Sequence, residues 1–300
     1  MDSVLAQWEE KENLTPAEEW AALQQVVYNT AKTYPGKPDR KHQDWFDPND
    51  QELQTLIKRV VARWSEHFQK LLNVPGDINH EALDNIPQRI TKTSLCEIPT
   101  MDEMARAIAC LKDGKAPGGD GIPAEVWKHG GDNLFSRLHQ LITKVGSVPQ
   151  AWKDASVVTI YKKGDRTDCG NFRGISLLSI SGRIFARILL NRLSTHITPE
   201  VVPETQCGFR GNRSTVDMIF CLRQLQEKCI EQDRPLYMVF VDFSKAFDTV
   251  GRTRLWQPLR KYGCPQKFTT MIKALHTGMM ANASVGEEVS ESFGVTNGVK

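Results

Sequence analysis

Apolar residues recur at steps of three and four along residues 51–73, and polar residues fill most positions between them. The apolar set is Leu53, Leu56, Ile57, Val60, Val61, Trp64, Phe68, Leu71 and Leu72. Such steps bring side chains to one side of an α-helix, which turns once every ~3.6 residues. The pattern predicts an amphipathic helix with one apolar face.

A second helix is predicted to begin at Thr100. Thr100 and Glu103 have the spacing of a capping box, in which each side chain accepts a hydrogen bond from the other residue's backbone N–H. The expected buried stripe is Met101, Met104, Ile108 and Leu111. A loop follows at 113–121 (DGKAPGGDG), and its glycines permit positive φ angles. Two more helices are expected at about 123–129 and 132–146.

Strands are predicted at two places. Residues 157–161 (VVTIY) are rich in β-forming side chains and end in a turn that carries Lys162 and Lys163. Residues 236–241 (LYMVFV) are continuously apolar, which is typical of a strand buried on both faces. Each segment is short enough for one strand of a larger sheet.

Two further helices are predicted between these strands, at 180–193 and 214–232. In the first helix, Ile184, Ile188 and Leu189 point inward, and arginines are spread around the helix at 183, 187 and 192. The stretches 34–50 and 73–99 have no helical or strand period and are interpreted as exposed connectors. Helices and strands do not alternate regularly, which favours an α+β fold over a doubly wound sheet.

The composition is that of an ordinary soluble globular protein, with 40% hydrophobic and 25% charged residues. The formal net charge is only +2, so a nucleic-acid role must depend on local groups of Lys and Arg. No apolar run approaches the ~18 residues that cross a bilayer, and the acidic N-terminus lacks the basic start of a signal peptide. We therefore expect an intracellular protein, cytoplasmic or nuclear.

Seven cysteines are scattered along the chain, at 96, 110, 169, 207, 221, 229 and 264. They form no CxxC pair and their number is odd, which argues against a zinc ribbon and against a secreted disulfide framework. We expect reduced, mostly buried thiols without disulfide partners.

Asp242 directly follows the apolar run 236–241, at the expected C-terminal end of a buried strand. An ionised carboxylate there needs compensation for lost hydration. A divalent metal ion provides it, and two-metal phosphoryl transfer requires carboxylates at fixed points. From this segment alone, an aspartate that caps the turn 244–248 is the simpler interpretation.

Residues 242–248 (DFSKAFD) resemble the first catalytic block of reverse transcriptases, specifically those of non-LTR retrotransposons, in which the form is close to VDFxKAFD. Other stretches resemble the same family in the same order: 63–73 (RWSEHFQKLLN), 111–125 (LKDGKAPGGDGIPAE), 157–178, 206–215 (QCGFRGNRST) and 294–300 (GVTNGVK). The family usually has Pro where this chain has Gly119. One block is weak evidence, but several in order identify residues 51–300 as similar to this family.

The resemblance implies a role for residues near Asp242. Asp242 would bind both catalytic Mg²⁺ ions, and the backbone carbonyl of Phe243 would face the same ions. Phe247 matches the position under the sugar of the incoming nucleotide, where a ring excludes a 2′-hydroxyl and so selects deoxynucleotides. Without the resemblance, a core aromatic at the start of a helix is an equally good interpretation. Asp248 is expected to be a capping or hydrogen-bonding residue.

Cations in two blocks match positions that face anionic ligands in the family. Lys162, Lys163 and Arg173 would contact the triphosphate of a dNTP, and Arg173 is the strongest candidate because a guanidinium binds phosphate oxygens bidentately. The alternative is that the lysines only solvate a hairpin tip. Arg210 and Arg213 either touch the template backbone or tie their loop to neighbouring helices.

The resemblance also implies a domain division within a right-hand polymerase fold. Residues 100–235 are expected to be the fingers and 236–300 an incomplete palm, with the thumb absent. A helical extension and linker precede them at 51–99, and residues 1–50 resemble a connector from an upstream endonuclease domain. The implied partners are an RNA template, a DNA primer and a dNTP, with no membrane.

A complete active site needs a second carboxylate block, usually a Tyr/Phe-x-Asp-Asp hairpin. The acidic residues after Asp248 are only Glu287, Glu288 and Glu291, and none stands in such a hairpin. We therefore expect an RNA-directed DNA polymerase by family, but no activity from this chain alone. The alternative is a catalytically dead remnant that binds RNA or a protein. An unrelated phosphotransferase is disfavoured, because no full GxxxxGK[ST] motif occurs.

Overall fold

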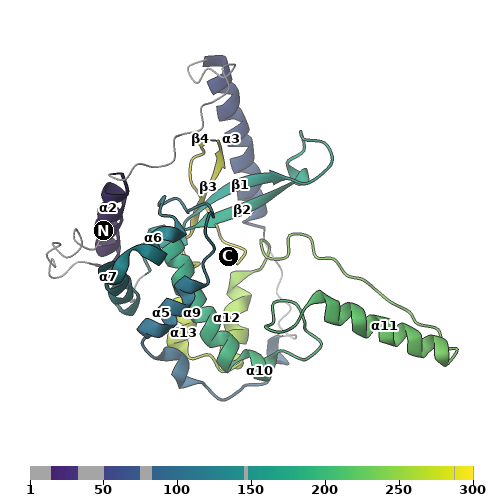
Figure 1. Ribbon diagram of the computed structural model, residues 1–300. Helices are drawn as coiled ribbons and strands as arrows, with labels where there is room; N and C mark the ends of the chain where they lie inside the picture. Colours follow the sequence, from purple (N-terminus) through teal and green to yellow (C-terminus); the bar gives the residue numbers. More distant parts are fainter. Residues whose placement is uncertain (1–14, 33–50, 75–82, 145–147, 287, 300) are drawn as a thin grey trace.

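A mixed sheet brings together strands that lie far apart in the sequence (Figure 1). The computed structural model describes residues 15–32, 51–74, 83–144, 148–286 and 288–299. The strands are β1 (Ala155–Tyr161), β2 (Phe172–Leu178), β3 (Met280–Val285), β4 (Glu288–Val289) and β5 (Phe293–Gly294). The order is β2-β1-β3-β4, and β5 also pairs with β3. β1 and β2 form an antiparallel hairpin, whereas β3 runs parallel to β1 with Ala281 opposite Ala155.

Helices make up most of the remaining structure, which is α+β as predicted. The longer ones are α2 (Pro16–Lys32), α3 (Gln51–Leu71), α5 (Met101–Ala109), α7 (Gly131–Thr143), α9 (Ile180–His196), α11 (Thr215–Glu231), α12 (Arg252–Lys261) and α13 (Gln266–Ala274). The short ones are α6 (Ala124–His129), α8 (Gln150–Lys153) and α10 (Thr198–Val201), with 3₁₀ turns η1 (Thr93–Cys96) and η2 (Cys169–Asn171).

Helix α3 packs its C-terminal half against the sheet. Val61, Trp64 and Phe68 are buried there, and the ring of Trp64 meets the edge of Phe172 with centroids 4.9 Å apart. Position 174 requires glycine, because a Cβ there would lie 2.4 Å from the ring of Phe68. The helix predicted at 51–73 is therefore confirmed, and it covers the strand pair.

The N-terminal half of α3 projects beyond the sheet (Figure 1). Leu56 is 55% exposed and Val60 is 46% exposed, although both belong to the predicted apolar face. Length explains the difference, because a 21-residue helix is about 31 Å long, whereas the six residues of β3 span only about 20 Å. Among the described residues, the sheet is too short to cover the whole apolar face.

Residues 16–32 form helix α2, although the sequence analysis placed them in a connector. Trp20, Leu23 and Val27 are buried in the main hydrophobic core. Trp20 stacks on Trp127, with ring centroids 6.1 Å apart, and meets Trp152 edge-on at 5.5 Å. The connector interpretation therefore does not hold for this stretch, whose apolar residues have helical spacing. The connector predicted at 34–50 lies outside the described residues.

The main core is built from helices whose inward faces agree with the sequence pattern. Met104 and Ile108 of α5 are buried, as are the three inward residues predicted for α9. Thr100 forms the predicted capping box: its hydroxyl accepts from the N–H of Glu103 at 3.2 Å, and its own N–H donates to the Glu103 carboxylate at 2.9 Å. Met101, by contrast, is exposed. The remaining predicted helices correspond to α6, α7 and α11.

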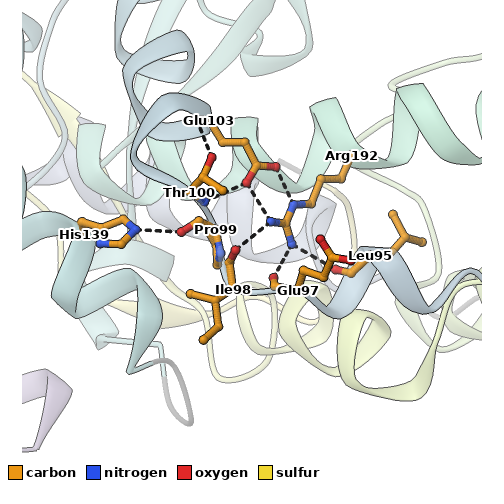
Figure 2. Close-up of polar contacts among 8 residues, drawn as sticks. All are labelled: Leu95, Glu97, Ile98, Pro99, Thr100, Glu103, His139 and Arg192. Atoms are coloured by element: carbon orange, nitrogen blue, oxygen red, sulfur yellow. Dashed lines mark hydrogen bonds and ion pairs between the residues drawn. The ribbon is translucent and has the colours of Figure 1, made fainter.

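Arg192 on α9 is buried, which the sequence analysis did not foresee. Its guanidinium binds both carboxylate oxygens of Glu103, each at 2.7 Å (Figure 2). Its remaining N–H groups donate to the carbonyls of Leu95, Glu97 and Ile98 at 2.5–3.3 Å. All five guanidinium N–H groups are thus used, and they clamp the connector before α5 between α5 and α9.

The glycine-rich loop at 113–121 is docked on the junction between β2 and α9. The buried carboxylate of Asp120 accepts a hydrogen bond from the Ser179 hydroxyl at 2.6 Å. Burial raises the pKa of Asp120, and the bond from Ser179 opposes that shift. A Cβ at Gly118 would lie 2.4 Å from the backbone nitrogen of Ser179, whereas Gly119 has nothing within 4 Å. The loop therefore depends on glycine at 118 but not at 119.

Helix α11 and the apolar run after it extend away from the rest of the molecule (Figure 1). No side chain of α11 is buried. Residues 236–241 form no strand, and Tyr237, Val239 and Phe240 are 81–90% exposed. The prediction of a strand buried on both faces is therefore wrong for this structure. Such a strand needs hydrogen-bonded neighbours, and no described strand runs beside these residues.

The seven cysteines are all free thiols, but they are not mostly buried. Cys207 and Cys264 are buried, whereas Cys110 and Cys221 are exposed. Burial raises the pKa of the Cys264 thiol to about 11. In the described part of the chain, no helix has both the length and the apolar character needed to cross a membrane.

Candidate functional site

The hairpin of β1 and β2 presents three cations to solvent. Arg173 lies on β2 opposite Ile160, and Lys162 and Lys163 follow β1 in the turn. All three side chains are exposed, and none forms an ion pair with a residue that the structure describes. Cations without carboxylate partners are available to bind an anionic ligand.

The two faces of this hairpin differ. Tyr161 and Phe172 lie edge to face, with centroids 5.3 Å apart, on the face that packs against Trp64 of α3. Because side chains alternate along a strand, Arg173 points to the opposite face, away from α3. Arg166, which the sequence analysis did not single out, lies 4.8 Å from the Tyr161 ring centroid and makes a cation–π contact.

Asp242 is exposed, and its carboxylate makes no hydrogen bond or ion pair with any described residue. The following turn is closed by the backbone instead. The N–H groups of Asp248 and Thr249 both donate to the carbonyl of Lys245, at 3.0 and 3.2 Å. Lys245 itself has a positive φ of 50°. The described contacts therefore do not support a capping role for Asp242, whose carboxylate is open to a ligand.

Phe247 lies in this turn and is 54% exposed, so it is not a core aromatic. Its ring is met edge-on by Phe209, with centroids 5.4 Å apart. This contact joins the block 206–215 to the block 242–248. The sequence analysis did not identify Phe209 as a site residue. The one feature that could have indicated it is an aromatic side chain within a loop that is otherwise rich in Gly and Arg. Phe243 is also exposed.

Arg210 and Arg213 share one carboxylate. Arg210 donates to Glu204 at 2.6 Å and to the carbonyl of Pro203 at 2.9 Å, and Arg213 donates to the other oxygen of Glu204 at 2.5 Å. These bonds lower the pKa of Glu204, the one from Arg213 most strongly. These contacts close the loop on itself, because Pro203 and Glu204 belong to the same loop and not to a neighbouring helix. A role at the template backbone and a role in tying the loop to neighbouring helices both stay predictions.

The segment 242–250 is connected to the residues after α3 through residues 297 and 298. The N–H of Asn297 donates to the carbonyl of Leu72, and the N–H of Gly298 donates to the carbonyl of Val250. Burial lowers the pKa of His67 on α3, and the charges of Lys245 and Arg63 lower it further, whereas Asp168 raises it.

The described residues do not form a complete metal centre. Mg²⁺ takes oxygen ligands in near-octahedral geometry. In the described ranges, no group of three or more His, Cys, Asp or Glu side chains is placed to hold a metal ion. Asp242 and the carbonyl of Phe243 provide too few oxygens for two ions. The residues present therefore do not fit a two-metal site without further ligands.

Known proteins match part of this chain. The profile of the family "Reverse transcriptase (RNA-dependent DNA polymerase)" matches residues 160–300. The RNA-directed DNA polymerase from mobile element jockey of Drosophila melanogaster is 31% identical over 174 residues, which cover 56% of this chain and 18% of that protein.

Two other relatives give similar alignments. The Pol polyprotein from type-1 retrotransposable element R1 of Bradysia coprophila is 32% identical over 157 residues, which cover 50% of this chain and 15% of that protein. The transposon TX1 uncharacterized 149 kDa protein of Xenopus laevis is 26% identical over 204 residues, or 67% of this chain and 16% of that protein. The alignments thus span less than a fifth of each of these three relatives.

Proposed function

We propose that this chain, which belongs to the reverse transcriptases of non-LTR retrotransposons, supplies the nucleotide-binding fingers and part of the palm of an RNA-directed DNA polymerase. Its substrates are a dNTP, an RNA template and a DNA primer. The observation that carries this proposal is the set of unpaired cations at Lys162, Lys163 and Arg173 on one hairpin. A triphosphate is the anionic part of the proposed substrate, and these side chains match it in charge.

Each residue then has a distinct task. Arg173 binds two phosphate oxygens through its planar guanidinium, and the two lysines add point charges at the turn. Phe247 lies under the sugar and excludes a 2′-hydroxyl, with Phe209 holding the ring edge-on. We assign Asp242 and the carbonyl of Phe243 as this chain's contribution to the Mg²⁺ site, and the other ligands come from outside the described residues.

Removing the guanidinium tests the phosphate role directly. Arg173→Ala should weaken binding of Mg²⁺–dATP by about 10- to 100-fold, because a hydrogen bond to a charged group is worth about 1.5–3 kcal/mol. The measurement is equilibrium binding to the 300-residue protein. Arg183→Ala is the matched control, since Arg183 is an exposed arginine on α9 with no proposed ligand. Equal affinity in wild type and Arg173→Ala would refute the assignment.

The incomplete metal centre leads to a second expectation. We expect the 300-residue protein not to extend a DNA primer on an RNA template with Mg²⁺ and dNTPs. Among the described residues, Asp242 is the one carboxylate assigned to the metal site, and one carboxylate cannot hold two ions at a fixed separation. Primer extension on a gel is the measurement. Any product that persists in Asp242→Ala comes from a contaminating polymerase. Product that depends on Asp242 would overturn the expectation of inactivity.

One observation favours a second candidate function, a catalytically inactive module that binds RNA or another protein. The side chains of α11 and of residues 236–241 expose many large apolar groups, which is typical of interaction surfaces. This candidate predicts that the protein does not bind Mg²⁺–dATP at all. The binding measurement above therefore separates the two functions.

A further inference from the structure

The end of helix α3 holds residues 294–299 from one side. The side-chain oxygen of Asn73 accepts from both the N–H and the hydroxyl of Thr296, at 2.9 and 2.7 Å. The amide group of Asn73 donates to a carbonyl of the same segment, 221 positions away in sequence, at 2.9 Å. The N–H of Asn297 donates to the carbonyl of Leu72 at 3.0 Å. The segment is therefore anchored to the two residues that directly follow α3.

The block that follows Asp242 holds the same segment from the other side. The N–H of Gly298 donates to the carbonyl of Val250 at 2.8 Å, and the N–H of Val299 donates to the carbonyl of Phe247 at 2.9 Å. Gly298 has a φ of +79°, and a Cβ there would lie 2.8 Å from the carbonyl oxygen of Asp248. The two backbones thus touch directly, and a side chain at 298 would separate them.

Arg252 fixes this junction from within. It is buried, and its guanidinium donates to the carbonyls of Gly298 at 2.7 Å, His276 at 2.5 Å and Val295 at 2.8 Å. Burial lowers its pKa, and no carboxylate among the described residues pairs with it. The three bonds come from two different nitrogens of the guanidinium, Nε and Nη1, which the planar group holds at a fixed separation.

We infer that Asn73 and Arg252 are positioning residues for the nucleotide site: they hold residues 294–299 in register with the backbone of Phe247. This inference rests on the proposed function, in which Phe247 lies under the sugar of the dNTP. The bond from the N–H of Val299 to the carbonyl of Phe247 restrains the backbone that carries this ring. Helix α3 is thereby connected to the site through the segment 294–299, although its own side chains touch no proposed ligand.

Amide hydrogen exchange on the 300-residue protein tests the positioning itself. Asn73→Ala and Arg252→Lys should each raise exchange of the amides of 296–299 by about 5- to 10-fold, as loss of one or two local hydrogen bonds predicts. Arg252→Lys keeps the charge, but one ammonium nitrogen cannot take the places of both Nε and Nη1. The matched controls are Gln69→Ala on α3 and Arg260→Lys on α12, both exposed. Unchanged exchange at 296–299, or an equal rise over all of α5 and α9, would overturn the inference.

The dissociation constant of Mg²⁺–dATP distinguishes a positioning role from a purely structural one, because a purely structural role would leave it unchanged. Asn73→Ala and Arg252→Lys should raise the dissociation constant of Mg²⁺–dATP about 3- to 10-fold, while the dissociation constant of a single-stranded RNA stays unchanged. Variants that bind Mg²⁺–dATP as wild type does refute this inference and leave the proposed function standing. If the wild-type protein does not bind Mg²⁺–dATP, both the proposed function and the link between residues 294–299 and a nucleotide site are refuted. The exchange measurement then tests only whether Asn73 and Arg252 hold residues 294–299 in place.

Discussion

Replacing Arg192 with Met should lower the free energy of unfolding by about 3–5 kcal/mol. The substitution removes one partner of a largely buried ion pair and leaves the charge of Glu103 without its counter-ion. Met fills a similar volume but donates nothing to the Glu103 carboxylate or to the three carbonyls that the guanidinium binds. Urea unfolding at pH 7 measures the difference. Arg187→Met, on the exposed face of the same helix, should change stability by less than about 0.5 kcal/mol.

The pH dependence of this ion pair identifies its origin. The hydrogen bond from Arg192 lowers the pKa of Glu103 below its usual 4.5. A carboxyl group with a lowered folded pKa contributes stability that is present above the unfolded pKa and is lost as the pH falls through the folded pKa. The stability gap between wild type and Glu103→Gln should therefore be full at pH 7 and shrink below pH 4.5. A gap that stays constant down to pH 3 would contradict the ion-pair origin.

Gly118→Ala should lower the free energy of unfolding by about 3 kcal/mol, because the new methyl group would meet backbone atoms that cannot move independently. Its Cβ would lie 2.4 Å from the nitrogen of Ser179 and 2.5 Å from the carbonyl carbon of Leu178. Either the glycine-rich loop or the N-terminus of α9 must shift, and the bond between Asp120 and Ser179 is then strained.

The adjacent glycine provides the control for this substitution. Gly119→Ala has open space and should leave stability unchanged or raise it by up to about 0.5 kcal/mol, since alanine restricts the unfolded chain. Thermal unfolding of both variants makes the comparison. Equal melting temperatures for the two variants would show that the contact of Gly118 with Ser179 and Leu178 is unimportant.

Local signals in the sequence predict much of the secondary structure. The capping box at Thr100 and the apolar spacing of α3 and α9 depend on residues within two turns of one another, so they can be read without knowing the fold. The strand prediction at 236–241 failed because strand pairing is not a local property. Its apolar composition describes what a strand would bury, whereas pairing depends on a neighbouring strand that the composition of the run does not specify.

The sequence indicates candidate site residues but not the contacts that surround them. Asp242 and Phe247 are proposed from the block that contains them, and the structure leaves both exposed to solvent. Arg192 and Arg252 escaped notice because a single arginine in a helix is most often a surface cation. Their burial follows from backbone carbonyls of distant segments, which no side-chain pattern records.

The parallel pairing of β1 with β3 sets the order in which the chain can fold during synthesis. Ala155 lies opposite Ala281, so 126 further residues must be added before this pair can form. At about 5–20 residues per second, that interval lasts roughly 6–25 s. Until β3 has been made, β1 can pair only with β2 among its two neighbouring strands, and its other edge is open to wrong pairing with other chains. Pairing between strands so far apart in sequence is also intrinsically slow, so this edge is an expected site of aggregation during synthesis.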